Sequence, residues 1–178
     1  MLRIKCDVTK VVTLLTEADK RIIQGQVSGL NKLAKQAKTT ASKEIRKEYG
    51  VNVKGLNEGK TLTYKEATVQ RLISEVSGTG RGISLKYFGA RQVKSGVSVA
   101  VKKGKRKILT SAFGPNIARL GGNVFERAGK ERTPIVKKFG PGAALMLKSK
   151  PVLEGIKTYI GLNYKRIMDH EIQYFMKK

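Results

Sequence analysis

The chain has few of the residues that usually carry catalysis or cross-linking. Its 178 residues include one Cys, one His and no Trp. Cys6 has no second Cys for an internal disulfide, and its distance along the chain from His170 argues against a zinc site or a Cys–His pair. Asp169, His170 and Glu171 are adjacent, but consecutive residues on a helix point in different directions. The sequence therefore predicts no enzyme activity, no metal and no cofactor.

Long apolar runs and a secretory signal are also missing. We therefore expect a protein that folds in a reducing cytoplasm and has no membrane partner. Apolar residues make up 40% of the chain and charged residues 28%, which is the composition of a globular protein. The length predicts one domain over residues 1–150, followed by a helical extension over residues 151–178.

Acidic residues are scarce, since 13 Asp and Glu stand against 37 Lys and Arg and leave a net charge of +24. The span 76–125 contains no acidic residue, and its ten basic residues are Arg81, Lys86, Arg91, Lys94, Lys102, Lys103, Lys105, Arg106, Lys107 and Arg119. An unneutralised field of this size attracts polyanions. Nucleic acid, acidic protein neighbours and a merely soluble surface are three explanations that the composition leaves open.

A long helix is predicted over residues 16–49. Apolar or small residues recur there at a spacing of three to four, at Ala18, Ile22, Leu30, Leu33, Ala34, Ala37, Ala41 and Ile45. Thr16 and Asp19 form a plausible capped start, and Gly50 a plausible stop. The opposite face carries Lys32, Lys35, Lys38, Lys43, Arg46 and Lys47. That basic face either contacts phosphate or is simply solvated.

After Gly50 the periodicity changes to that of strands. Alternation over residues 97–101 predicts a half-buried strand, and the sequence KKGKRK a turn into a second strand ending at Leu109. A second hairpin is expected from residues 124–127 and 135–136, with the Phe125 ring buried and Pro134 marking an edge strand. Shorter strands are expected at 61–64, 72–76 and 83–88, and a helix competes with the strand over 65–76.

The last segment predicts a helix that starts at Pro151. Its apolar face carries Val152, Ile156, Tyr159, Ile160, Asn163, Ile167, His170 and Tyr174. His170 is expected to pack beside Ile167 and Tyr174. Together these elements predict an α+β fold, with a long N-terminal helix, an antiparallel sheet of hairpins and a C-terminal helix.

Two glycine-rich segments are weak echoes of nucleotide-binding loops. Residues 55–61, GLNEGKT, have three residues between the glycines where a phosphate-binding loop needs four, and Glu58 stands where phosphate oxygens would lie. Residues 78–82, GTGRG, precede a strand-like segment, whereas a dinucleotide loop opens a helix. We expect a polar turn at the first segment and a flexible connection at the second, with Leu85 and Phe88 in the core.

The turn of the first hairpin is the best candidate for a functional site. Five cations surround Gly104 and are expected to project from it: Lys102, Lys103, Lys105, Arg106 and Lys107. Arg81 and Arg91 are further candidates for binding DNA or an acidic partner. No aromatic or amide set for reading bases lies nearby, so contact with nucleic acid would be nonspecific. The alternative is a solvated turn that keeps a sheet edge soluble.

Residues 96–141 carry motifs in a recognisable order. These motifs are Gly96, Val97, Val99, Val101, Gly104, Ala112 and Phe113, then Val124, Phe125, Arg127, Gly129, Arg132, Pro134, Ile135, Gly140 and Pro141. With the helical segment 30–51, they resemble the phage minor tail protein Z family, the tail-completion proteins of long-tailed phages. The resemblance covers roughly residues 20–147 and departs from the family at Gly142, where a Ser is expected, and after Leu147.

This resemblance implies a structural protein of the virion at the head-proximal end of the tail. It implies a homo-oligomeric ring, most simply six-fold, in contact with the tail tube or terminator and with head–tail connector proteins. It further implies help in joining tail to head, with nonspecific contact to the end of the genomic DNA. Subunit-interface candidates are Thr133, Pro134, Ile135, Val136 and Tyr174.

A second function of a different class is consistent with the charge. A basic nucleic-acid-binding protein, associated with the ribosome or the nucleoid, would need a similar positive field. The sequence shows no helix-turn-helix, RNA-binding aromatic motif or zinc finger in support of that function. A tail component made in the host cytoplasm remains our first hypothesis.

Overall fold

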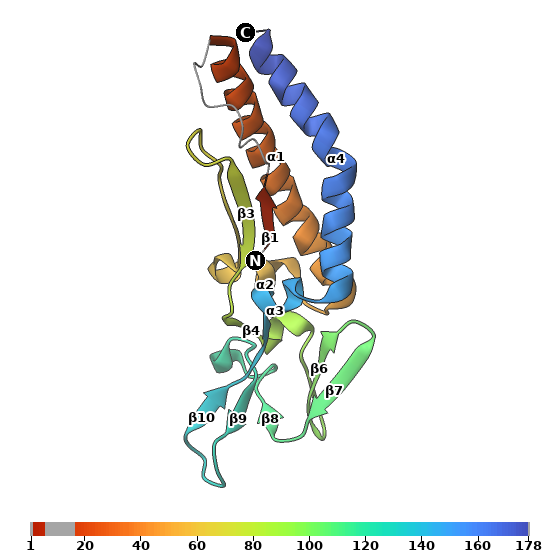
Figure 1. The fold of residues 1–178 in the computed structure, drawn as a ribbon. Helices are drawn as coiled ribbons and strands as arrows, with labels where there is room; N and C mark the ends of the chain where they lie inside the picture. The colour runs from red at the N-terminus through yellow and green to blue at the C-terminus, as the bar shows by residue number, and fades with distance from the viewer. Residues whose placement is uncertain (1, 6–16, 178) are drawn as a thin grey trace. The chain divides into compact units, whose positions relative to one another are not determined.

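The computed structural model describes residues 2–5 and 17–177, drawn in colour in Figure 1. The predicted α+β class is confirmed, with two long helices and several small antiparallel sheets. Cys6 and the predicted capping residue Thr16 lie outside the described residues. The chain divides into two compact units, the first made of residues 1–41, 63–77 and 153–178, the second of residues 42–62 and 78–152. The predicted boundary at residue 150 stays a prediction.

The first unit is built on α1 (Glu17–Glu48) and α4 (Lys150–Met176), which run side by side in Figure 1. The predicted apolar stripe of α1 is confirmed, because Leu30, Leu33, Ala34 and Ala37 are fully buried. Leu30 and Leu33 pack with Ile167 and Met168 of α4 in one apolar cluster. This packing supplies the apolar burial that long, lysine-rich helices need for stability.

Two glycines let the helices come close. A Cβ atom on Gly25 would lie 2.7 Å from Ile172 Cα, and one on Gly29 would lie 2.6 Å from the Met168 sulfur. Both distances are shorter than real Cβ contacts. At Gly25 the contact is with the backbone of α4, so a larger side chain there would push α1 and α4 apart, whereas at Gly29 the flexible Met168 side chain would have to move.

A three-stranded sheet completes this unit, in the order β1-β3-β2. Its strands are β1 (Leu2–Lys5), β2 (Leu62–Lys65) and β3 (Ile73–Gly78). The strand prediction at 72–76 is confirmed and the competing helix is wrong. The Ser74 hydroxyl donates to the Leu30 carbonyl of α1 at 3.1 Å, and Val76 packs on Ala34 and Ala37. These contacts hold β3 against the small-residue face of α1.

The second unit opens with two short helices and contains the predicted basic hairpin. Its helices are α2 (Val53–Asn57) and η1 (Glu58–Lys60), and the strands around the hairpin are β5 (Arg91–Val93), β6 (Gly96–Lys102) and β7 (Lys105–Leu109). The hairpin of β6 and β7 is confirmed, and β5 pairs with the other edge of β6. Gly96 has φ +136°, and a Cβ there would lie 2.1 Å from the Leu109 carbonyl oxygen, so this position needs glycine.

A second small sheet has the order β10-β9-β8. Its elements are β8 (Ala112–Phe113), η3 (Ala118–Leu120), β9 (Phe125–Arg127) and β10 (Ile135–Lys137). The second hairpin and its edge strand are therefore confirmed. The expected burial of Phe125 is wrong: its ring is half-buried, and Val124 is the fully buried residue. The side chains alternate here, so neighbouring residues face opposite ways.

The predicted strand at 83–88 is wrong in its second half. Strand β4 (Gly82–Ser84) passes directly into a 3-10 turn, η2 (Leu85–Phe88). Residues three apart share one face of such a turn, so Leu85 and Phe88 are both buried, as predicted. Strand β11 (Phe139–Gly142) pairs with β4, and α3 (Ala143–Leu147) follows it.

We expect Leu33→Ala to destabilise the first unit strongly. Removing a fully buried leucine side chain costs about 2 to 5 kcal/mol of unfolding free energy. Urea denaturation followed by circular dichroism measures this loss. The matched control is Leu162→Ala on α4, where the side chain is 77% exposed, and this change should stay within about 0.5 kcal/mol. Equal losses in both variants would contradict the α1–α4 packing.

Candidate functional site

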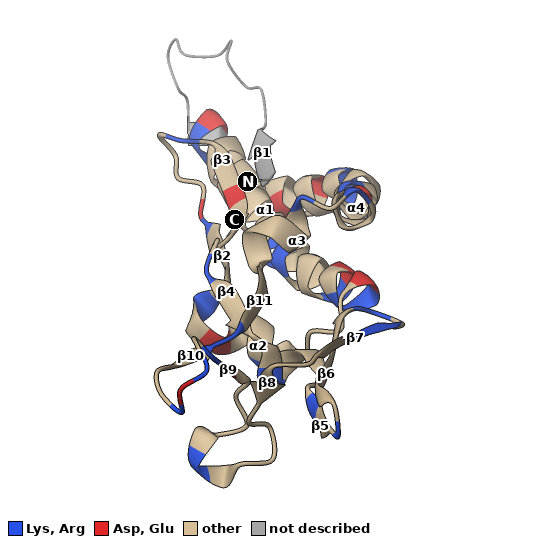
Figure 2. Cartoon of the chain, turned by 90° about the horizontal axis from the view of Figure 1, so that it is seen from below, with Lys and Arg blue, Asp and Glu red and all other residues tan. Residues whose placement is uncertain are grey.

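The β6–β7 hairpin places three lysines on one face. Antiparallel pairing sets Val99 opposite Lys107 and Lys102 opposite Lys105. Val97 and Val99 are buried on this face, whereas Lys102, Lys105 and Lys107 are exposed. Lys105 and Lys107 share a face because they are two residues apart on β7, and a register shift between Val99 and Lys102 sets Lys102 opposite Lys105. The predicted cationic turn thus becomes a row of lysines above an apolar base. Figure 2 shows Lys and Arg along this hairpin and on β5.

The row borders a groove with a volume of about 450 Å³, all of it within the second unit. Its lining residues are Leu85, Val99, Val101, Lys102, Lys105, Lys107, Leu109, Lys138, Phe139, Gly140 and Pro141. Every ionisable residue in this lining is a lysine. We call it the lysine groove. Lys138 also forms an ion pair with Glu126 at 2.5 Å, so the other three lysines carry the uncompensated charge.

Arg106 does not project with its neighbours. Its Nε donates to Ser98 Oγ at 2.9 Å, and its Nη2 donates to the carbonyls of Gly89 and Ser98 at 2.7 and 3.0 Å. Position 106 lies on the face of β7 opposite the groove, where a guanidinium can satisfy several acceptors at once. The expectation that five cations project from the turn is therefore wrong for Arg106. Its partner Ser98 is buried, so β6 is more deeply buried there than the predicted half-buried strand.

The remaining basic candidates lie outside the groove lining. Lys103 is exposed at the turn, where its backbone N–H donates to the Glu48 carbonyl at 2.9 Å. Arg91 is exposed on β5, opposite Ser98 in the register. Arg81 lines a second hollow. The structure thus brings Lys102, Lys105 and Lys107 together in the lysine groove, whereas Arg81 and Arg91 lie outside its lining.

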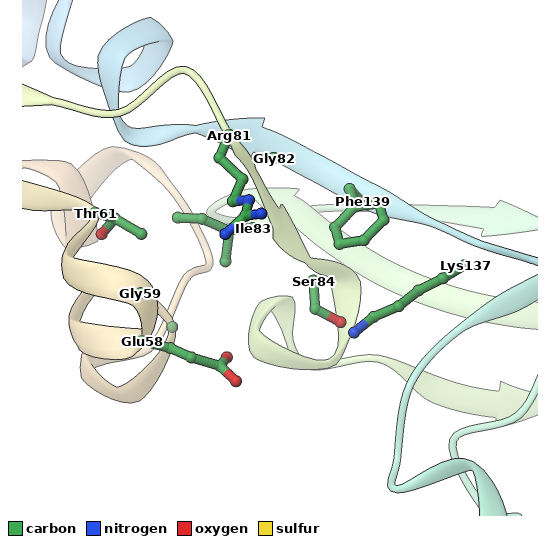
Figure 3. Close-up of a pocket in the computed structure, with 10 residues that line it drawn as sticks. Glu58, Gly59, Thr61, Arg81, Gly82, Ile83, Ser84, Lys137 and Phe139 are labelled. Carbon is green, nitrogen blue, oxygen red and sulfur yellow. The ribbon is translucent and has the colours of Figure 1, made fainter.

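The second hollow has a volume of about 280 Å³ and contains both signs of charge. Figure 3 shows Arg81, Lys137 and Glu58 reaching into it from different elements. The Lys137 amine lies 5.3 Å from the centre of the Phe139 ring, and the Ser84 hydroxyl donates to Asn123 Oδ1 at 2.9 Å. No Cys or His lines this hollow.

The subunit-interface candidates lie on two separate elements. Thr133 and Pro134 precede β10 and are exposed, and Ile135 and Val136 lie on that edge strand, 39% and 51% exposed. Tyr174 lies near the end of α4, is 55% exposed and packs edge-on against Phe175. Exposed apolar side chains beside an unpaired strand edge are typical of a protein-binding surface.

A buried carboxylate, Glu171, connects the two helices of the first unit. It accepts hydrogen bonds from Ser28 at 2.7 Å and from Lys32 at 2.8 Å, both on α1. The hydrogen bond from Lys32, followed by that from Ser28, lowers the pKa of Glu171 from 4.5 to about 2. His170 was expected to pack in the apolar face, but its side chain is 69% exposed and lies 3.0 Å from the same carboxylate. The cluster is a structural clamp between α1 and α4.

In residues 2–5 and 17–177, no group of three or more His, Cys, Asp and Glu side chains could hold a metal ion. Within the same ranges, no helix is both long and apolar enough to cross a membrane.

Sequence reasoning missed the second wall of the groove. Lys138, Phe139 and Pro141 come long after the hairpin in the sequence, and they lie beside it on β11 and at the residue just before that strand. The signal was visible as an exposed aromatic between two lysines and a Gly-Pro pair, in the segment KKFGPG. Only Gly140 and Pro141 of this segment belong to the family-like motif. Its role as a wall follows from the pairing of β11 with β4.

Comparison of the chain with protein-family models, with curated proteins and with solved structures finds no match. The resemblance to the phage tail-completion family therefore rests on the residues quoted above.

Arg106→Gln should destabilise the second unit, because it removes hydrogen bonds from a charged donor to Gly89 and Ser98. Such bonds contribute about 1.5 to 3 kcal/mol, and we expect a loss near the lower end in urea denaturation. Lys105→Gln removes the same charge from the opposite face of β7 and should change the unfolding free energy by less than about 0.5 kcal/mol. If the two variants lost the same stability, Arg106 would be a surface cation like its neighbours.

The Glu171 clamp should make stability depend on pH below neutrality. The folded pKa is about 2 against a usual value of 4.5, so the contribution is complete above about pH 4.5 and is lost as the pH falls toward 2. Urea denaturation at several pH values should show the parent up to about 3 kcal/mol more stable than Glu171→Gln at neutral pH, with the difference shrinking below pH 4.5. Glu154→Gln, an exposed change on the same helix, should follow the parent. A constant difference across pH would contradict the clamp.

Proposed function

We propose that this protein is a structural component of a phage virion, a tail-completion or neck protein at the head-proximal end of a long tail. In this role several copies form a ring about the tail axis, which we expect to be six-fold. The ring helps join the tail to the head. Its neighbours are the tail tube or terminator and the head–tail connector.

The observation that carries the proposal is the edge strand β10. It lies within the segment whose motifs resemble the tail-completion family, and it exposes Ile135 and Val136 beside an unpaired backbone edge. Such an edge pairs readily with a strand of another chain. A ring needs two different complementary surfaces on each subunit, and the exposed Tyr174 region of α4 is our candidate for the second.

The positive charge supports a second candidate, a nonspecific nucleic-acid-binding protein. A charge of +24 would attract any DNA or RNA by releasing counterions. The three aligned lysines of the groove could contact phosphates without reading bases. The cellular location separates the two candidates, because a ribosome- or nucleoid-associated protein would not remain in purified phage particles.

We expect immunogold electron microscopy of the parent phage to label the junction of tail and head in several copies. A ring about the tail axis is the physical reason, since each copy presents the same surface around it. Label at the distal tip, or recovery only with ribosomes or nucleoid, would rule out the proposed role.

The edge strand provides a matched test of assembly. Val136→Lys should reduce ring formation of the purified protein in analytical ultracentrifugation, because a charge on an exposed edge opposes strand pairing. Val69→Lys is the control, since Val69 is 56% exposed in a turn of the first unit. Both variants should unfold like the parent.

A further inference from the structure

The lysine groove combines two chemistries that one kind of ligand satisfies. Its base is apolar, with Leu85 and Val99 buried and Val101 and Leu109 half-buried. Its rim is cationic on the side of the β6–β7 hairpin. There Lys102, Lys105 and Lys107 form no ion pair within the described residues. On the other side stands Phe139, which is 55% exposed.

Charge complementarity determines the sign of the occupant. The rim lysines stand on neighbouring positions of one hairpin, so each raises the potential felt by the others, and no carboxylate lines the groove to offset it. An anionic ligand relieves this repulsion. Because the β6–β7 ladder holds the strands, binding does not need to order the backbone.

The apolar base determines the class of the occupant. Duplex DNA presents phosphates and sugars to a surface of this kind and has no group that would cover a floor of Val, Leu and Phe side chains. A polypeptide does have such groups, since apolar and acidic side chains two residues apart lie on the same face of one extended segment. The volume of about 450 Å³ is within the range of about 300–1,000 Å³ found for ligand sites.

We propose that the lysine groove binds an acidic, extended segment of a neighbouring protein. An apolar side chain of that segment lies on the base beside Phe139, and flanking carboxylates pair with Lys102, Lys105 and Lys107. This inference rests on the proposed function, which supplies protein neighbours at the tail–head junction. It names the chemistry by which one of them is recognised.

A direct binding measurement tests the proposal. The probe is a short fluorescein-labelled peptide in which every second residue is Ser and the positions between them are Glu and Leu in turn, so that Glu and Leu share one face of the extended chain. It is titrated with purified protein, and binding is followed by fluorescence anisotropy. The triple variant K102Q/K105Q/K107Q should bind it about tenfold more weakly, because exposed ion pairs each add a modest factor. The matched control K94Q/K103Q/K130Q removes equal charge at exposed lysines outside the groove lining and should weaken binding by about twofold or less.

A second variant tests the apolar part without changing charge. Phe139→Ser should weaken binding of the peptide by about fivefold to tenfold, since it removes an exposed ring beside the base of the groove. Leu162→Ser, at an exposed residue of α4, is the control. Charge reversal adds a positive result: K102E/K105E/K107E should bind a Lys–Leu version of the peptide better than the parent does. Thermal unfolding of each variant confirms that it is folded.

The outcomes separate the alternatives. Equal loss in the groove triple and its control would overturn the proposal, and so would peptide binding that Phe139→Ser leaves unchanged. Binding of a labelled DNA duplex provides the comparison. If the triple variant weakens binding of duplex and peptide equally, and Phe139→Ser changes binding of neither, the groove is a polyanion surface and the peptide proposal fails. The assay uses purified protein, so a failed virion localisation would remove the proposed function while leaving this result intact.

Discussion

The backbone pairing of β6 along both of its edges is the constraint on which the lysine groove depends. β7 pairs along one edge, and β5 pairs along the first part of the other. Beyond β5, the Gly50 N–H donates to the Val101 carbonyl at 3.1 Å, and the Lys103 N–H donates to the Glu48 carbonyl. A Cβ on Gly50 would lie 2.0 Å from the Ala100 carbonyl oxygen, so this close approach requires glycine. The strand that carries the groove base is thus held by its backbone on both sides.

This support explains how the chain tolerates a row of like charges. The lysines on neighbouring positions of the hairpin repel one another. Because water screens exposed charges, this repulsion costs little folding free energy. The guanidinium of Arg106 works in the opposite sense, because it is directed back onto Ser98 and Gly89 and strengthens the hairpin. Two cation types in one short segment therefore have different roles. The lysines remain available to a partner, and the arginine holds the turn in place.

The cations on the basic face predicted for the first helix likewise differ in whether they have partners inside the chain. Lys32 is held by the Glu171 carboxylate, Lys38 lies 5.7 Å from the centre of the Tyr64 ring, and Lys47 pairs with Glu44. The Arg46 Nε donates to the Ser42 carbonyl at 3.1 Å, so four of the six cations on that face have partners inside the chain. Their long side chains also cover apolar surface with their methylene groups. The net charge of +24 already counts the carboxylates of the two ion pairs, so these contacts decide where on the helix the charge is neutralised and not how much remains.

The sequence by itself determined the long helices, both hairpins and the edge position of β10. Each follows from local chemistry: a spacing of three to four along α1, alternation in β6, and a proline before β10. It also located Lys102, Lys105 and Lys107. Only the tertiary structure decided that Lys138 and Phe139 join them at the start of β11, that Arg106 faces away, and that residues 85–88 turn rather than extend. The physical reason is that periodicity specifies which face of an element is apolar, whereas which elements meet depends on strand pairing between residues far apart in the chain.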